Sequence, residues 1–255
     1  MKRVLTAAAL IPVIVYTVLW AHFWVFFAVL AAVALLCYRE YSGIAAGYGF
    51  GKLGPVGYAA GLVLLLVRND AWLVAAVLAC SVLALAMRSE NPAQGMPRAA
   101  LAITGVIYIF GCWKCAIPMR EANPHWLMYG LMVSWAGDIG AYYVGRRFGR
   151  HKMAPRVSPK KSWEGAAASV ATSILIAGAY LAYFVPGTSI PAAIALTAGA
   201  NAAGQLGDLA ESALKRGAGV KDSGTILPGH GGFLDRVDST LFALPLVYCW
   251  LKLAL

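Results

Sequence analysis

The sequence predicts an all-α polytopic membrane protein with about nine transmembrane helices and a cytosolic N-terminus. Three observations predict it: little charge, long uncharged stretches, and basic residues that collect on one side. Of 255 residues, 60% are hydrophobic and 13% are charged, and the mean hydropathy is +0.69. A soluble domain of ordinary composition carries about 25% charged residues. This deficit excludes an ordinary soluble domain, because a lipid bilayer must be the solvent for most of the surface.

Uncharged stretches place the spans, since a helix needs about 20 apolar residues to cross the hydrocarbon core. Residues 4–38 are uncharged over 35 positions, and residues 165–207 over 43. Both stretches are too long for one helix, so each predicts two spans. The first break is expected near residues 21–22, and the second at Pro186-Gly187 and Pro191, because proline ends helices. Single spans are expected at residues 53–67, 71–87, 99–117, 126–144 and 239–253.

Charge asymmetry orients the chain, because cytosolic loops collect Lys and Arg. Residues 146–161 contain seven basic residues and no acidic one, which places this loop inside. With nine spans, 17 of the 21 basic residues then share the cytosolic side. Reading residues 4–38 as a single helix would instead export Lys2 and Arg3. The basic charge follows topology and accompanies no groove-reading motif, so no nucleic-acid partner is expected.

A polar stripe runs along one predicted helix in the last third of the chain. Asn201, Gln205, Asp208, Ser212 and Lys215 follow spacings of four, three, four and three residues. These spacings place them on one face of an α-helix. A carboxylate at the end of a membrane helix is costly unless it is paired, hydrated or bound to metal. Asp208 is therefore either a metal ligand in a polar cleft or the partner of Lys215 at the helix end.

A glycine-rich loop and two acidic residues follow this stripe. Six glycines lie in residues 217–232, together with Lys221, Asp222 and His230. Glycines let backbone N–H groups approach phosphate oxygens, and Lys supplies compensating charge. Asp235 and Asp238 come one helical turn apart where the last span begins. Mg²⁺ prefers oxygen ligands and typically takes one or two carboxylates plus substrate phosphates, although acids at a helix start also complement its dipole.

Residues 212–238 resemble the signature of the phosphatidate cytidylyltransferases, the CDP-diacylglycerol synthases. The family pattern is S-x-hydrophobic-K-R, four residues, K-D, then a small residue, P-x-H-G-G and D-R-x-D. It is met without departure by Ser212, Leu214, Lys215, Arg216, Lys221, Asp222, Gly224, Pro228, His230, Gly231, Gly232, Asp235, Arg236 and Asp238. Residues 137–152 and 158–165 are also similar to the family. The resemblance covers roughly residues 130–240, and the first 120 residues match only in being apolar.

The resemblance implies the reaction of CTP with phosphatidic acid to give CDP-diacylglycerol and pyrophosphate. It implies Mg²⁺, with room for a second metal ion, held by carboxylates at Asp208 and Asp235. It also implies a location in the plasma (inner) membrane and a homodimer. Residues 1–120 are then a scaffold of transmembrane helices, available for lipid or dimer contacts. Residues 121–255 are the catalytic region, with cytosolic loops at 146–164 and 212–238.

The expected roles divide into two groups. The catalytic candidates are Asp208, Asp235, Asp238, Lys215 and Lys221. The candidates for binding substrate phosphates are Lys160, Lys161, Ser212, Arg216, Asp222, His230, Gly231, Gly232 and Arg236. Three residues or segments keep open alternatives: Asp138 completes the cleft or makes a helix-end hydrogen bond, Lys160 binds phosphate or pairs with Glu164, and residues 146–161 bind acidic lipids or only determine topology.

Two other functions compete with this one. A CTP-dependent lipid kinase would share the substrates and the topology. A transporter would explain many spans with intramembrane polar residues, but it predicts an internal inverted repeat, and none is seen.

Overall fold

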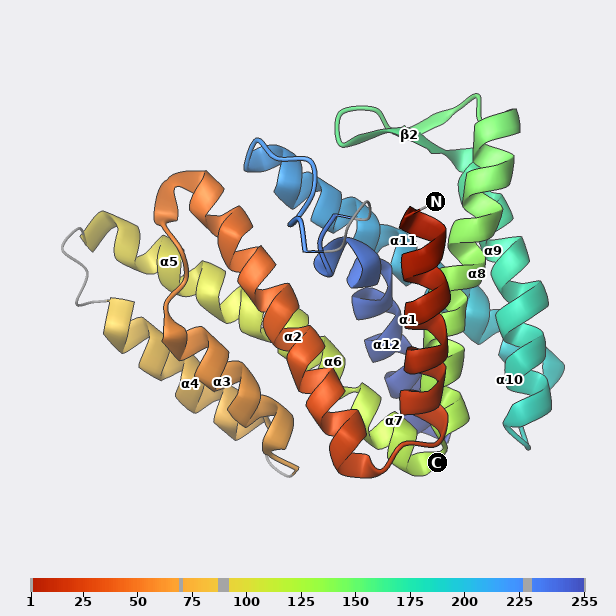
Figure 1. Cartoon of the computed structure of the whole chain (residues 1–255), viewed down its shortest axis with the longest axis horizontal. Coiled ribbons are helices and arrows are strands. Elements are labelled where there is room, and N and C mark those ends of the chain that lie inside the picture. Colours follow the sequence, from red (N-terminus) through yellow and green to blue (C-terminus); the bar gives the residue numbers. More distant parts are fainter. Residues whose placement is uncertain (1, 69–70, 87–91, 227–230, 255) are drawn as a thin grey trace. The chain divides into compact units, whose positions relative to one another are not determined.

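The computed structural model describes residues 2–68, 71–86, 92–226 and 231–254, and over these ranges the protein is predominantly helical. The all-α prediction is confirmed, apart from one small two-stranded sheet (Figure 1). The chain forms two compact units. One contains Met1–Thr6, Phe23–Lys114 and Leu214–Arg236, and the other contains Ala7–His22, Cys115–Ala213 and Val237–Leu255.

The first unit is a group of helices with an aromatic core. Its elements are α2 (Phe23–Ala45), η1 (Ala46–Phe50), α3 (Pro55–Leu66), α4 (Ala71–Ala86), α5 (Pro92–Gly105), η2 (Val106–Gly111) and α6 (Cys112–Lys114), where η marks a wider, π-type helical turn. Helix α3 packs against α4, α5 and η2, and α4 also packs against α5 (Figure 1 labels α3, α4 and α5). The buried rings of Tyr38 and Phe110 lie 5.5 Å apart between these helices. Tyr38 and Phe110 fit because Gly57 and Gly61 face them, and a Cβ at either glycine would lie within 2.2 Å of a ring or its hydroxyl.

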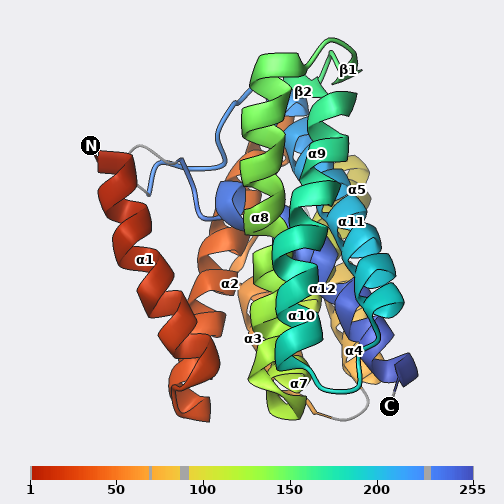
Figure 2. The ribbon, with the colours of Figure 1, turned by 90° about the vertical axis from the view of Figure 1, so that its right-hand side faces the viewer.

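The second unit is built on a pair of long helices. It contains most of α1 (Lys2–Leu19), then α7 (Ala116–Ala122), α8 (Pro124–Phe148), α9 (Trp163–Ser173), η3 (Ile174–Gly178), α10 (Ala179–Phe184), most of α11 (Ile190–Gly217) and most of α12 (Leu234–Ala254). Helix α8 runs alongside α9–η3–α10 (Figure 2). Small residues allow this approach, as is usual between membrane helices. A Cβ at Gly140 of α8 would lie 2.3 Å from Thr172 Oγ1 of α9.

Part of the polar stripe on α11 stabilises this helix packing. Asn201 Nδ2 donates hydrogen bonds to Ser169 Oγ at 3.0 Å and to Ser173 Oγ at 2.8 Å. Gln205 Nε2 donates to the carbonyl of Ala166 at 3.2 Å. Asn201 and Gln205 therefore join α11 to α9, and the part of the stripe that carries predicted site residues begins at Asp208.

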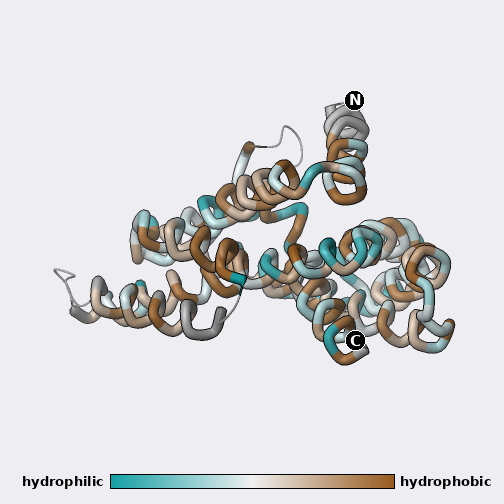
Figure 3. Tube along the Cα trace, turned by 90° about the horizontal axis from the view of Figure 1, so that it is seen from below, coloured by the Kyte–Doolittle hydropathy of each residue, from teal (hydrophilic) through white to brown (hydrophobic). Residues whose placement is uncertain are grey.

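Both predicted breaks in the long apolar stretches are confirmed. Helix α1 ends at Leu19 and α2 begins at Phe23, and α10 ends at Phe184 before α11 begins at Ile190. Each predicted single span also overlaps a helix over its described residues. Hydrophobic residues dominate along the helices, and hydrophilic residues form only short stretches (Figure 3).

Three helical segments are long and apolar enough to cross a membrane within the described ranges: Phe23–Phe50, Ala93–Ala122 and Trp163–Phe184. Shorter apolar helices occupy Leu10–Leu19, Pro55–Leu66 and Ala75–Ala84. This is a membrane protein, whereas the count of nine spans and the cytosolic N-terminus stay predictions.

The sheet lies in the basic loop, where no strand was expected. Strand β1 (Lys152–Ala154) pairs antiparallel with β2 (Ser158–Ser162) and leads from α8 into α9 (Figure 2). Glu164, in the first turn of α9, accepts hydrogen bonds from the backbone N–H of Arg150 and from His151 Nδ1 at 2.6 Å. Glu164 therefore binds the segment before β1, while Lys160 is exposed on β2.

Candidate active site

The predicted site residues lie on four elements: the β-hairpin, the last turns of α11, the loop that follows, and the first turns of α12. The boundary between the two units passes through α11 and α12, so each unit contains some of these residues.

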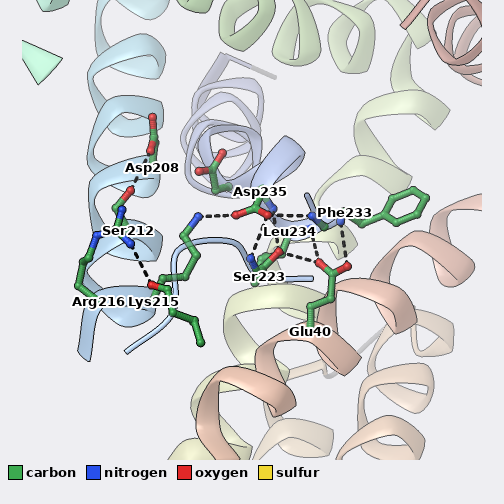
Figure 4. Close-up of polar contacts among 12 residues, drawn as sticks. Glu40, Asp208, Ser212, Lys215, Arg216, Ser223, Phe233, Leu234 and Asp235 are labelled. Atoms are coloured by element: carbon green, nitrogen blue, oxygen red, sulfur yellow. Dashed lines mark hydrogen bonds and ion pairs between the residues drawn. The ribbon is translucent and has the colours of Figure 1, made fainter. Parts of the chain in front are cut away.

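In the second unit, Asp208 is the centre of one polar group. Its Oδ2 atom lies 2.6 Å from Lys161 Nζ, and its Oδ1 atom accepts a hydrogen bond from Ser212 Oγ at 3.3 Å (Figure 4 shows Asp208 and Ser212). About a third of the Asp208 side chain is exposed. Lys161 is thus a cationic partner of Asp208, and Lys215 pairs with Asp235. The structure thus brings together three predicted residues, one of them from the basic hairpin.

Asp238 brings further negative charge into the second unit. The residue is 8% exposed, and Glu211 is completely buried. Asp238 lies before the apolar part of α12, and burial raises the pKa of its carboxyl well above the ordinary value. The negative charges of Asp208, Glu211 and Asp138 raise this pKa further, in that order. Such repulsion favours protons or a cation near these carboxylates.

In the first unit, Lys215 and Asp235 form a buried ion pair. Their side chains are 9% and 5% exposed, and Lys215 Nζ contacts Asp235 Oδ1 (Figure 4). The Oδ2 atom accepts hydrogen bonds from the backbone N–H of Ser223 at 2.9 Å and of Gly232 at 2.8 Å. Burial raises the pKa of Asp235, but the hydrogen bonds from Lys215, Gly232 and Ser223 outweigh it and leave the pKa below its ordinary value. Asp235 is therefore an ionised carboxylate that organises the loop around it.

The remaining predicted residues of the first unit line the loop. Lys221, Asp222 and Arg236 are exposed, as binding a ligand from solution requires. Arg216 Nη1 donates to the carbonyl of Val220 at 2.9 Å, so its guanidinium stabilises the start of the loop. Gly231 adopts a φ of 80°, in the left-handed region that favours glycine. The predicted residue His230 lies outside the described residues.

The oxygen donors of the second unit have the chemistry that Mg²⁺ prefers. Asp208, Glu211 and Asp238 supply carboxylate oxygens, and a cation would relieve the repulsion that Asp238 experiences. Asp235 fits less readily, because Lys215 and two N–H groups already occupy its oxygens. Within the ranges that the structure describes, no three His, Cys, Asp or Glu side chains are grouped closely enough to hold a metal ion.

Two buried acids were missed in the sequence. Glu211 lies one turn after Asp208 on α11, where its proximity to Asp208 was the available signal. Glu40 lies on α2 and binds the loop through hydrogen bonds to residues more than 180 positions away. No motif or spacing relates Glu40 to that loop, so only the three-dimensional structure could reveal it.

Comparison with known proteins agrees with the signature. The profile of the cytidylyltransferase family matches residues 1–254. The chain belongs to this family. A phosphatidate cytidylyltransferase of Bacillus subtilis is 42% identical over 152 residues, which cover 58% of this chain and 56% of the relative. One from Staphylococcus aureus is 40% identical over 167 residues, covering 65% and 64%.

A third relative, from Haemophilus influenzae, shows the same likeness. It is also a phosphatidate cytidylyltransferase and is 45% identical over 123 residues, which cover 47% of this chain and 43% of the relative. In these three comparisons the chain spans between 43% and 64% of the relative's length.

Proposed function

We propose that the protein is a phosphatidate cytidylyltransferase, which converts CTP and phosphatidic acid into CDP-diacylglycerol and pyrophosphate. The observation that carries this proposal is the complete signature of residues 212–238 in a chain of the cytidylyltransferase family. The exposure of Lys221 on the loop and of Arg236 in the first turn of α12, beside the buried Lys215–Asp235 pair, supports a phosphate site at this place. The names of the relatives support phosphatidate as the acceptor.

The reaction needs little acid–base chemistry from the protein. A phosphate monoester has a second pKa of about 6, so phosphatidate is already largely a dianion at neutral pH. One of its oxygens attacks the α-phosphorus of CTP, and the bond from that phosphorus to the bridging oxygen of the β-phosphate breaks. Pyrophosphate leaves with the electron pair of that bond. The task of the protein is therefore to position two anions and to offset their repulsion.

Cationic and glycine residues suit that task. Lys161, Lys221 and Arg236 offer positive charge to phosphate oxygens, and glycine at Gly231 and Gly232 allows the backbone to come close to them. The N–H of Gly232 itself donates to Asp235. Lys160, Ser212, Arg216 and Asp222 remain proposed phosphate-site residues on the strength of the signature and the basic loop. Lys215 acts on the site through Asp235 in this structure, and contacts phosphate only if that ion pair opens.

We place Mg²⁺ at Asp208, with Asp238 beside it. The signature adds Asp235 as a proposed ligand, and the acidic residues of the site would allow a second metal ion. A Mg²⁺ ion held by these carboxylates would supply positive charge to the triphosphate and to the departing pyrophosphate.

The membrane context is part of the same proposal. We infer nine spans, a cytosolic N-terminus and a plasma-membrane location with the active site facing the cytosol, because this arrangement gathers the basic residues on one side. CTP then reaches the site from the cytosol and phosphatidate from the bilayer. A homodimer is proposed from the family resemblance alone.

The labelled phosphorus atom of CTP separates this function from a lipid kinase. With purified protein, Mg²⁺ and phosphatidate, CTP labelled at the α-phosphorus should label the lipid fraction. CTP labelled at the γ-phosphorus should label only soluble pyrophosphate, because the β and γ groups leave together. A γ label in the lipid would identify a kinase instead, and no label in lipid from either nucleotide would contradict both enzymes.

A further inference from the structure

A buried acid in the first third of the chain has no role in the chemistry described so far. Glu40 of α2 is 5% exposed. A carboxylate removed from water is costly unless hydrogen bonds or charges compensate it. The partners of Glu40 therefore indicate what the side chain does.

These partners all lie on the signature loop and at the start of α12 (Figure 4). Glu40 Oε1 accepts a hydrogen bond from the backbone N–H of Phe233 at 3.0 Å. Its Oε2 atom accepts from the N–H of Leu234 and from Ser223 Oγ, both at 2.8 Å. Helix α12 begins at Leu234, and the first N–H groups of a helix have no acceptor within it. Glu40 thus caps α12 from another helix and places negative charge at its positive end.

Two signature glycines are fitted to this carboxylate. A Cβ at Gly224 would lie 2.6 Å from Glu40 Oε1, and a Cβ at Gly232 would lie 2.3 Å from Oε2. Real Cβ atoms essentially never come closer than 3.0 Å to such an atom. Glycine at these positions therefore lets the loop close around Glu40, in addition to any approach to phosphate.

Ser223 connects Glu40 to the predicted catalytic carboxylate. Its hydroxyl donates to Glu40 and accepts from the N–H of Asp235 at 3.3 Å. Its own N–H donates to Asp235 Oδ2 at 2.9 Å. Asp235 is in turn paired with Lys215. Ser223 thus links Glu40 by hydrogen bonds to the buried Lys215–Asp235 pair, so a shift of Glu40 would also shift Asp235.

The other end of the loop is attached to the same helix. The Tyr48 hydroxyl on η1, which continues α2, donates to the carbonyl of Leu214 at 3.0 Å. A Cβ at Gly217 would lie 2.0 Å from that hydroxyl, so the end of α11 packs directly on Tyr48. The segment α2–η1 therefore holds the loop where it leaves α11 and where it enters α12.

We propose that Glu40 is a positioning residue that fixes the loop and Asp235 in the geometry that binds the triphosphate of CTP. This inference rests on the proposed function and gives the N-terminal helices a part in it: they hold the nucleotide loop rather than only surrounding it with lipid-facing surface.

Glu40→Gln tests the proposal with little change in size. The new NH₂ group cannot accept a hydrogen bond, so Phe233 or Leu234 loses its acceptor. Leaving a buried donor without an acceptor costs about a factor of ten or more in an equilibrium constant. The value of kcat/KM for CTP should therefore fall by about that factor, through a raised KM for CTP. A merely structural role would lower the amount of folded enzyme and kcat while leaving this KM unchanged. Glu121→Gln is the matched control, because Glu121 is an exposed glutamate of α7.

Hydrogen exchange gives a readout that does not need activity. In Glu40→Gln, backbone amides in peptides covering residues 231–240 should exchange faster, while those of α8 should not change. Unchanged exchange there together with an unchanged KM for CTP would overturn the proposal. If the wild type forms no CDP-lipid, the proposed function fails, and the exchange measurement alone then decides whether Glu40 anchors the loop.

A glycine substitution tests the same contact from the loop side. Gly224→Ala should raise the KM for CTP in the wild type, because its methyl group displaces the Glu40 carboxylate. Gly43→Ala is the control, since a Cβ at this position of α2 meets no atom within 4 Å. In a Glu40→Gln background Gly224→Ala should raise the KM for CTP by a smaller factor than in the wild type, because the contact between residues 40 and 224 is already weakened. Equal effects in the two backgrounds would contradict the proposal.

Discussion

Single carboxylates of the site differ chiefly in what neutralises them. Asp208 is a third exposed and pairs with Lys161, which is itself about a quarter exposed. Asp235 is almost fully buried, and Lys215 and two N–H groups saturate its oxygens. A partly hydrated carboxylate can exchange its partner for a ligand at low cost, whereas opening a buried pair is expensive. Asp208 is therefore the better position at which to test the metal site without unfolding the protein.

Asp208→Asn should lower kcat by about a hundredfold or more, which is the usual effect of removing a group that stabilises transition-state charge. The variant should still insert and fold, because the partly exposed Lys161 can be hydrated once its partner is gone. Excess CTP should not restore the rate, since the loss is not one of uniform substrate binding. The measurement is steady-state turnover beside a thermal-unfolding curve in detergent. Near-wild-type turnover would remove Asp208 from the proposed metal site.

Among the elements, helix positions were predictable and the local structure of loops was not. The uncharged length of residues 4–38 required a hairpin, and α1 and α2 meet within a few residues of the predicted turn. Pro186 ends one helix of the second pair, but Pro191 lies in the first turn of α11, where a missing N–H costs nothing. The β-hairpin at 152–162 carries no alternation of hydrophobic residues, so its sequence gave no strand signal.

The contact between α8 and α9 offers a test at this scale. Gly140→Ala should destabilise the protein by about 1–3 kcal/mol, because its Cβ would meet Thr172 Oγ1 at 2.3 Å and the carbonyl of Ala168 at 2.7 Å. Gly145→Ala on the same helix should change little, since its nearest neighbours are 3.5 Å away. Denaturation of the two variants in detergent would compare them directly. Equal stabilities would show that α8 and α9 do not pack as described.

At the scale of the whole molecule, the composition predicted a protein surrounded by a lipid bilayer, and the signature predicted the protein family. Sequence proximity accounts for part of the candidate site, because Asp208 and Lys215 share α11 and Asp235 follows Lys215 after 20 positions. The sequence could not predict the ion-pair partner of each carboxylate. Asp208 pairs with Lys161 from the β-hairpin, and Asp235 pairs with Lys215 across the loop. Glu40 was out of reach for the same reason, since its contact with Leu234 joins residues 194 positions apart.

The orientation of the molecule in the membrane can be tested with cysteines placed on the two expected sides. Arg150 lies in the basic segment that charge asymmetry assigns to the cytosol, and Arg68 lies among the few basic residues assigned to the outer side. Cys80 and Cys249 are exposed in the native chain, so all five cysteines must first be replaced. In sealed, oriented membranes an impermeant thiol reagent should then modify Arg150→Cys only from the cytosolic face and Arg68→Cys only from the outer face. Both sites are exposed, so a failure to react reflects sidedness rather than burial, and lysed membranes should label both.

Modification of Arg150→Cys from outside would show that the topology is the reverse of the proposed one, with the proposed site on the side of the membrane away from cytosolic CTP. Modification of both sites from one face would instead require a different number of spans between them.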